Sequence, residues 1–239
     1  MPREAVFVII IRLLQCLTTY QLVALTFLML IFTGTGFLML PAASVSGTSL
    51  SFVDALFTAT SAVCVTGLVV VDTGSYFTTF GQMVVITLIQ LGGLGVMTFA
   101  TLISVAIGKK INLRERLLIQ EALNQETVSG VVRMVLHIVR YTFIIEFVFG
   151  SILALHFYPI YGERAIYMGY WHSVSAFCNA GFDLFGNYDS LTKFVGDGVV
   201  NFCIMSLITL GGLGFLVMDD VLSKRRFKTL TVHSKVVII

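Results

Sequence analysis

Charge is scarce in this chain. Asp, Glu, Lys and Arg make up 12% of its 239 residues, against 57% hydrophobic residues. A soluble core of this length would need far more polar surface, so the composition excludes an ordinary soluble domain. Residues 13–53, 73–108 and 198–218 contain no charged side chain at all. Each run exceeds the ~20 residues with which a helix crosses a bilayer, which predicts an all-α integral membrane protein.

Metal-binding and catalytic side chains are also few. The four histidines are scattered, and the four cysteines lack metal-ligand spacing and lie in apolar surroundings. We therefore expect no metal site beyond a transported ion, no covalent cofactor and no nucleic-acid partner, and we interpret the cysteines as small buried residues. A membrane-bound enzyme is a weak alternative because it needs convergent His, Asp or Cys groups. The cysteines are Cys16, Cys64, Cys178 and Cys203.

The basic residues that are present gather in two segments, which predicts orientation. Positive segments stay on the cytoplasmic side, so we expect a multi-pass protein of the cell membrane with basic loops and both termini in the cytoplasm. The opposite side carries mostly acidic residues, which would raise the local cation concentration. The basic segments contain Lys109, Lys110, Arg114, Arg116 and Arg133, and Lys224, Arg225, Arg226, Lys228 and Lys235.

Hydrophobic runs divide the chain into spans and shorter apolar stretches. Spanning helices are predicted at residues 21–40, 80–108, 133–157 and 198–222. The stretches 51–62 and 165–177 are too short to cross, so each is expected to enter from the outer face as a half-helix and return as extended backbone. The resulting organisation is an N-terminal interfacial segment (1–20), a first repeat (21–108), an amphipathic cytoplasmic linker (109–132), a second repeat (133–222) and a basic tail (223–239).

The ends of the two short stretches are duplicates. Ser61, Cys64 and Gly67 recur at a constant offset of 114 residues as Ser175, Cys178 and Gly181, and Leu-Gly-Gly-Leu-Gly occurs at 91–95 and again at 210–214. Two spaced matches in the same order indicate an internal repeat. We therefore predict two parallel helix–pore-loop–helix repeats. The Gly-Gly-x-Gly runs lie in uncharged spans and are interpreted as close-packing contacts against the pore loops.

A half-helix that ends at mid-membrane presents the negative end of its dipole, followed by carbonyls without helical partners. Such carbonyls can replace the hydration shell of a monovalent cation such as potassium. The alternative is that Gly67 and Gly181 are turn glycines between helices. The predicted potassium filter comprises Val63, Cys64, Val65, Thr66 and Gly67 in the first loop, and Phe177, Cys178, Asn179, Ala180 and Gly181 in the second.

Glu146 is an ionisable residue within the third predicted span. An intramembrane charge is a candidate for function, and Glu146 could anchor a pore helix by hydrogen bonds or act in ion passage. Its partner cannot be read from the sequence.

Several motifs resemble the Trk/Ktr/HKT potassium transporter family over nearly the whole chain. They are Asp54-Ala55-Leu56-Phe57-Thr58-Ala59-Thr60-Ser61-Ala62, Val65-Thr66-Gly67-Leu68, Gln90-Leu91-Gly92-Gly93-Leu94-Gly95, Gln120-Glu121-Ala122-Leu123-Asn124-Gln125 and Asn179-Ala180-Gly181-Phe182. The resemblance implies potassium uptake and leaves sodium dependence open. It also implies a homodimeric membrane assembly on a cytosolic nucleotide-binding ring.

The family pattern has four repeats around one pore, whereas this chain supplies two. We expect a truncated or split transporter with a missing second half, in preference to a homodimer of half-pores. One alternative is a non-conducting structural or regulatory fragment that assembles with full-length subunits. Another is a carrier for a small organic solute, which would show polar or aromatic recognition groups near mid-membrane.

Overall fold

The computed structural model describes residues 19–95, 98, 117, 131–224 and 226–239, and these residues are helical apart from their connections. They contain no strand, only an isolated bridge between Ser44 and Phe77. The predicted N-terminal segment and cytoplasmic linker fall almost wholly outside this part of the chain. The α-helices are α2 (Thr19–Leu38), α3 (Phe52–Val63), α4 (Thr73–Tyr76), α5 (Thr79–Gly93), α8 (Val131–Tyr161), α9 (Arg164–Phe177), α10 (Gly198–Gly212), α11 (Phe215–Lys224) and α12 (Val232–Ile238).

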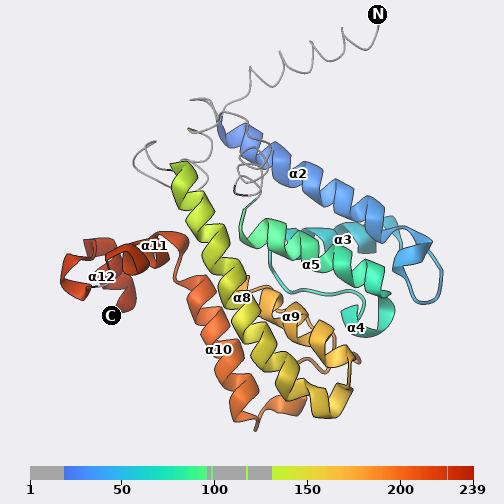
Figure 1. Ribbon diagram of the computed structural model, residues 1–239. Helices are drawn as coiled ribbons and strands as arrows, with labels where there is room; N and C mark the ends of the chain where they lie inside the picture. Colours follow the sequence, from blue (N-terminus) through green and yellow to red (C-terminus); the bar gives the residue numbers. More distant parts are fainter. Residues whose placement is uncertain (1–18, 96–97, 99–116, 118–130, 225) are drawn as a thin grey trace, which may run out of the picture.

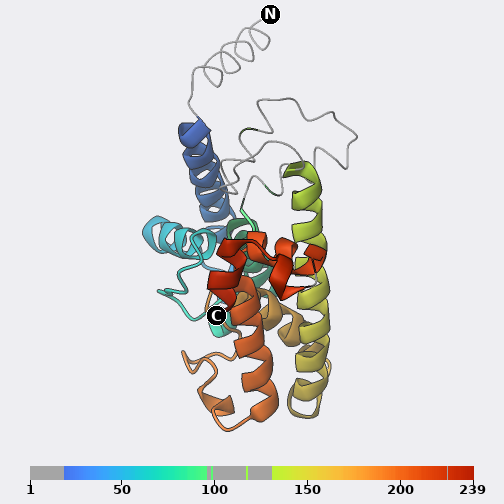
Figure 2. The same ribbon diagram turned by 90° about the vertical axis from the view of Figure 1, so that its left-hand side faces the viewer.

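The helices form two neighbouring groups. Figure 1 shows α2, α3 and α5 together, and α8, α9 and α10 beside them. The short helix α9 lies at the boundary and contacts α5. In Figure 2 the long helix α8 and helix α10 run alongside each other, and α11 and α12 gather near the upper end of α10.

Only α8 contains a described stretch, Met134–Tyr161, that is long and apolar enough to cross a membrane. Shorter apolar stretches occupy Val23–Leu38 and three further helices, α3, α5 and α10. The predicted span at 80–108 is described as a helix only to Gly93. The prediction of one continuous helix over 198–222 is wrong, because α10 ends at Gly212 and a separate helix begins at Phe215.

Glycine explains where α5 and α10 end. Gly95 and Gly214 follow the C-cap residues of these helices and adopt φ values of +81° and +84°. This left-handed conformation terminates a helix, and glycine adopts it without a Cβ clash. The repeated Gly-Gly-x-Gly run is therefore a helix terminator as well as the packing contact that its uncharged surroundings predict.

Side-chain caps define where α3, α5 and α10 begin. Ser51 accepts a hydrogen bond from the Asp54 N–H and begins α3, and Thr78 accepts one from the Gly81 N–H and begins α5. Asp197 accepts from two backbone N–H groups at the start of α10. These residues satisfy donors that a helix leaves unpaired in its first turn.

Two buried residues of α9 attach it to its surroundings. The indole Nε1–H of Trp171 donates to the carbonyl of Gln82 in α5 at 3.2 Å. The ring of His172 stacks on Phe185 with centroids 4.4 Å apart, and Phe185 packs against Phe157 of α8. These contacts hold the middle of α9 within the core, between α5 on one side and α8 on the other.

Candidate functional site

The two predicted loops follow the C-termini of α3 and α9. We call residues 64–68 loop 1 and residues 178–182 loop 2. Each begins with a cysteine that caps the helix in a right-handed conformation, with φ −84° and ψ 0° at Cys64 and φ −71° and ψ −5° at Cys178. The two loops therefore leave their helices with the same backbone conformation at the first residue.

Alternate residues of both loops have positive φ. The values are 57° at Val65 and 72° at Gly67 in loop 1, and 59° at Asn179 and 75° at Gly181 in loop 2. Positive φ is rare for a β-branched residue such as Val65, so it marks a conformation that the surrounding structure enforces. Thr66 and Ala180, which lie between these residues, do not have positive φ, so both loops have the same alternating pattern.

Loop N–H groups bond back to the preceding helix. Thr66 N–H donates to the Ser61 carbonyl at 2.9 Å, and Ala180 N–H donates to the Ser175 carbonyl at 2.8 Å. Among the described residues, no hydrogen bond ends on the carbonyl oxygens of residues 64–67 or 178–181. The N–H groups of the first three residues of each loop are thus occupied, while the carbonyls of residues 64–67 and 178–181 stay available.

The structure brings the two loops together. A Cβ on Gly67 would clash with the carbonyl oxygen of Ala180, and one on Gly181 would lie 3.8 Å from the Gly67 Cα. Val63, Phe177 and Ala180 are buried, Val65, Gly67 and Cys178 are half-buried, and Cys64, Thr66, Asn179 and Gly181 are exposed. The predicted burial of Cys64 is therefore wrong; that of Cys203 is confirmed, and Cys16 lies outside the described residues.

The Gly-Gly-x-Gly runs pack against the ends of the short helices. A Cβ on Gly92 would clash with the Val63 carbonyl, and a Cβ on Gly211 would clash with the Phe177 carbonyl. Val63 and Phe177 are the last helical residues before loops 1 and 2. The predicted close-packing role of these glycines is confirmed, and it places α5 and α10 directly against the loops.

Hydroxyl groups at the duplicated serines brace the loops in different ways. In loop 1, Thr66 Oγ1 donates to Ser61 Oγ at 2.9 Å. In loop 2, the buried Ser175 Oγ donates to the Phe182 carbonyl at 2.6 Å. The duplication points to these serines, but no local pattern indicates what each of them contacts.

His172 holds the chain that leaves loop 2. Its Nε2 accepts a hydrogen bond from the Leu184 N–H at 3.1 Å, and its Nδ1 contacts the Met168 carbonyl at 2.7 Å. Since a carbonyl only accepts, Nδ1 carries the proton and the ring is neutral. Sequence reasoning missed this role, because a single buried histidine has no motif that marks it.

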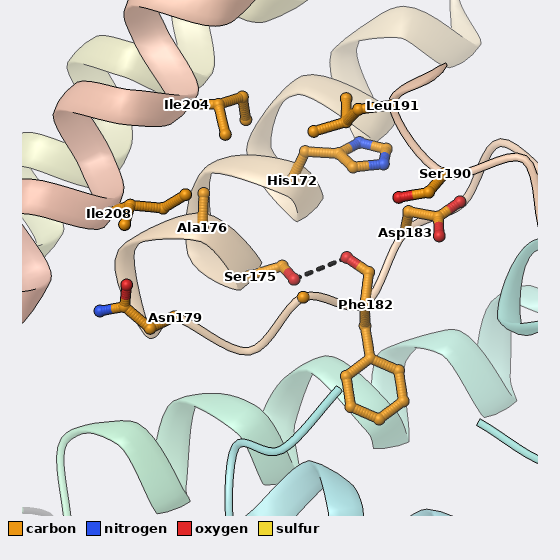
Figure 3. Close-up of a pocket in the computed structure, with 11 residues that line it drawn as sticks. His172, Ser175, Ala176, Asn179, Phe182, Asp183, Ser190, Leu191, Ile204 and Ile208 are labelled. Carbon is orange, nitrogen blue, oxygen red and sulfur yellow. Dashed lines mark hydrogen bonds between the residues drawn. The ribbon is translucent and has the colours of Figure 1, made fainter. Parts of the chain in front are cut away.

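A cavity of about 180 Å³ lies behind loop 2 (Figure 3). Ile204 and Ile208 of α10 form one wall, and the ring of Phe182 points away from it. Asp183 also lines the cavity, and partial burial raises the pKa of its carboxyl, opposed by the hydrogen bond from the Phe185 N–H. The bond between Ser175 and Phe182 crosses the space between α9 and the loop.

Glu146 does not line either loop, but it lies close to one of them. Its side chain is buried in α8, and Oε1 accepts a hydrogen bond from Gln90 Nε2 of α5 at 2.9 Å. The side-chain oxygen Oε1 of Gln90 in turn accepts a hydrogen bond from Cys178 Sγ at 3.6 Å. The partner that the sequence did not reveal is therefore Gln90.

Comparison with known proteins identifies the family. Residues 13–236 match the model of the TrkH family, described as a cation transport protein. The chain is 47% identical to the Ktr system potassium uptake protein B of Bacillus subtilis over 222 residues, covering 92% of this chain and 49% of that protein.

Two further relatives agree. Identity is 42% to the potassium/sodium uptake protein NtpJ of Enterococcus hirae, over 94% of this chain and 50% of the relative. The identity to the Ktr system potassium uptake protein B of Vibrio alginolyticus is 40%, and the match covers 92% of this chain and 48% of that protein. The chain thus spans about half the length of the curated relatives it matches. The predicted resemblance is confirmed, and the chain belongs to the TrkH family of cation transport proteins, a class of membrane transporters and not of enzymes.

Proposed function

We propose that this chain forms part of the ion pathway of a potassium uptake transporter in the cell membrane, with loops 1 and 2 supplying carbonyl oxygens to its selectivity filter. One observation carries the proposal: both loops adopt the same alternating backbone and lie against each other, and no described residue donates a hydrogen bond to the carbonyls of residues 64–67 and 178–181. Carbonyls arranged in this way can replace the water around a potassium ion without any charged side chain.

Within this proposal, residues 21–108 and 133–222 act as two parallel helix–pore-loop–helix repeats. Helices α3 and α9 are the half-helices, and their C-terminal ends direct partial negative charge toward the ion. Residues 63–67 and 177–181 line the filter. The basic segments face the cytoplasm, and the acidic residues near the opposite ends of the helices, such as Asp54 and Asp72, attract cations to the entrance.

Two loops cannot surround an ion by themselves. We propose that the remaining carbonyls come from a second pair of loops, supplied by another part of the transporter or by another copy of this chain. A cytosolic nucleotide-binding ring and a sodium requirement are parts of the same proposal, drawn from the resemblance. The printed name of the Enterococcus relative includes both potassium and sodium, which supports testing both ions.

The test is a chimera in which this chain replaces the matching half of the Bacillus subtilis relative. It is expressed in cells that lack potassium uptake systems, and uptake of potassium, rubidium and sodium is measured. We expect uptake that favours potassium, and Gly67→Ser should reduce the preference for potassium over sodium. Gly36→Ser is the matched control, because Gly36 is exposed on α2 with nothing within 4 Å of its Cβ position.

Two results would contradict the proposal. Unchanged selectivity in Gly67→Ser would exclude loop 1 from the filter. A chimera that reaches the membrane but carries no potassium would favour the second candidate, a non-conducting fragment that assembles with full-length subunits.

A further inference from the structure

A carboxamide links the two groups of helices beside loop 2. Gln90 of α5 donates from Nε2 to Glu146 Oε1 of α8 at 2.9 Å, and its own oxygen accepts from Cys178 Sγ at 3.6 Å. Gln90 therefore uses its donor and its acceptor at the same time, each toward a different element. Cys178 is the first residue of loop 2, directly before the strained Asn179.

The shape of α5 fits this link. Gly93 lies three residues after Gln90 and hence on the same helix face. A Cβ on Gly93 would lie 2.7 Å from Cys178 Sγ, closer than real Cβ contacts allow. Because Gly93 has no side chain, the Cys178 thiol can approach α5 and donate a hydrogen bond to the Gln90 carboxamide oxygen.

Glu146 is itself held from two directions. Its backbone carbonyl accepts a hydrogen bond from the buried Ser173 Oγ of α9 at 2.9 Å, while its side chain bonds Gln90. Its side chain also borders a groove of about 480 Å³ whose other lining residues are mainly apolar. Hydrogen bonds to a carboxylate are stronger in such surroundings, and an unpaired carboxylate there is costly.

We propose that Gln90 and Glu146 are positioning residues for loop 2. The Glu146 carboxylate orients the Gln90 carboxamide, and the carboxamide holds the Cys178 thiol, which fixes the start of the loop against α5. The effect on ion selection rests on the proposed function, whereas the bridge itself does not. Loop 1 has no equivalent: Cys64 is exposed, and no described residue bonds its side chain.

The first test measures thiol reactivity and needs no transport. The full chain is treated in membranes with N-ethylmaleimide, and labelling of Cys178 and Cys64 is followed by peptide mass spectrometry. Gln90→Leu should raise the labelling rate at Cys178 by about fivefold, the factor that corresponds to the net contribution of one hydrogen bond of ~1 kcal/mol. Cys64 is the internal control and should keep its rate.

Thr209→Val supplies a matched control. Thr209 precedes the second Leu-Gly-Gly-Leu-Gly run as Gln90 precedes the first, but its hydroxyl bonds the Met205 carbonyl within its own helix. Its replacement should leave Cys178 labelling unchanged. An unchanged rate in Gln90→Leu, or an equal rise in Thr209→Val, would overturn the bridge.

An exchange of the two polar residues separates the bridge from a loss of packing. Gln90→Glu alone places two carboxylates face to face, so Cys178 labelling should rise. Adding Glu146→Gln restores one carboxamide donor and one carboxylate with their positions exchanged, and the carboxylate at position 90 can still accept from the Cys178 thiol, so labelling should return to the original rate. Failure of the double variant to recover would contradict the assigned roles.

The second test asks whether the bridge affects ion selection. In the chimera, Gln90→Leu should lower the potassium-to-sodium uptake ratio, and the exchanged pair should restore it. If Gly67→Ser alters the ratio while Gln90→Leu does not, the positioning role is wrong and the proposed function stands. If the chimera carries no ion at all, the proposed function fails and the labelling result alone decides the bridge.

Discussion

Loops 1 and 2 share a backbone but differ in what holds it. Both place positive φ at alternate residues and both bond an N–H to the carbonyl of the duplicated serine. Loop 1 is braced by the hydrogen bond from Thr66 to Ser61 of the preceding helix α3, and its cysteine is exposed. Loop 2 is tied to α5 through its cysteine.

The difference shows which parts of a loop its own sequence decides. The glycine, the helix C-cap and the backward hydrogen bonds are local, so they occur in both copies. The side-chain anchors depend on which helix lies beside each loop, so they diverge. Loop 2 lies between α5 and α10, both of which the structure describes in contact with α9 or its loop.

The largest effect is expected from filling the glycine contacts that support both loops. Gly92→Ala and Gly211→Ala would each place a Cβ into the backbone carbonyl of the last residue of a short helix. Since backbone cannot give way as a side chain can, both variants should lose most of their folded protein. The yield of monodisperse protein in detergent measures this, and Gly36→Ala should keep the original yield.

A clear difference in folded yield between these two variants would contradict the similarity of the two loops. If Gly211→Ala folds normally while Gly92→Ala does not, the two glycines do not have equivalent roles.

The next effect distinguishes the two glycines of the proposed filter, Gly67 and Gly181. Alanine at positive φ costs about 1–2 kcal/mol at either position. Gly67→Ala adds a clash with the Ala180 carbonyl, whereas Gly181→Ala meets nothing closer than 3.8 Å. Potassium-to-sodium selectivity of the chimera should fall about tenfold or more for Gly67→Ala and less for Gly181→Ala. The reverse order would show that the contact between the loops is not as described.

A smaller effect should be confined to loop 2. His172→Phe keeps the ring volume but leaves the Leu184 N–H without its acceptor, which costs about 1–3 kcal/mol for a buried group. The melting temperature in detergent should fall, and the labelling rate of Cys178 should rise by a larger factor than that of Cys64. Equal changes at both cysteines would indicate general unfolding instead.

The smallest effect compares the duplicated serines. Ser175→Ala removes a buried bond of 2.6 Å to the Phe182 carbonyl, with an expected loss of ~1 kcal/mol. Ser61→Ala removes an acceptor from Thr66, whose hydroxyl also lies 3.4 Å from the Ser61 carbonyl. We therefore expect the smaller loss of thermal stability in Ser61→Ala, and the opposite ranking would mean that loop 1 depends on its internal brace.

Some features of this protein could be predicted because they depend only on residues close together in the sequence. Long uncharged runs predicted helices, and the repeated spacing around Gly67 and Gly181 predicted two similar turns after short helices. The division of the chain into repeats and the filter role of residues 63–67 and 177–181 stay predictions.

Other features were out of reach of pattern reasoning. The Leu-Gly-Gly-Leu-Gly run was interpreted as part of a continuous helix, although Gly214 ends α10 there. Hydrophobicity continues across this point, so composition alone does not show the break. Cys64 and Cys178 look alike in sequence, yet one is exposed and the other is bonded.

The sequence by itself determined the membrane class, the family motifs and the backbone of both loops, because hydropathy, glycine and helix ends act over a few residues. Only the tertiary structure decided that Gln90 joins Glu146 to Cys178 and that Gly67 meets Ala180. These contacts join residues 56, 88 and 113 positions apart, so they depend on how helices pack and not on any local pattern.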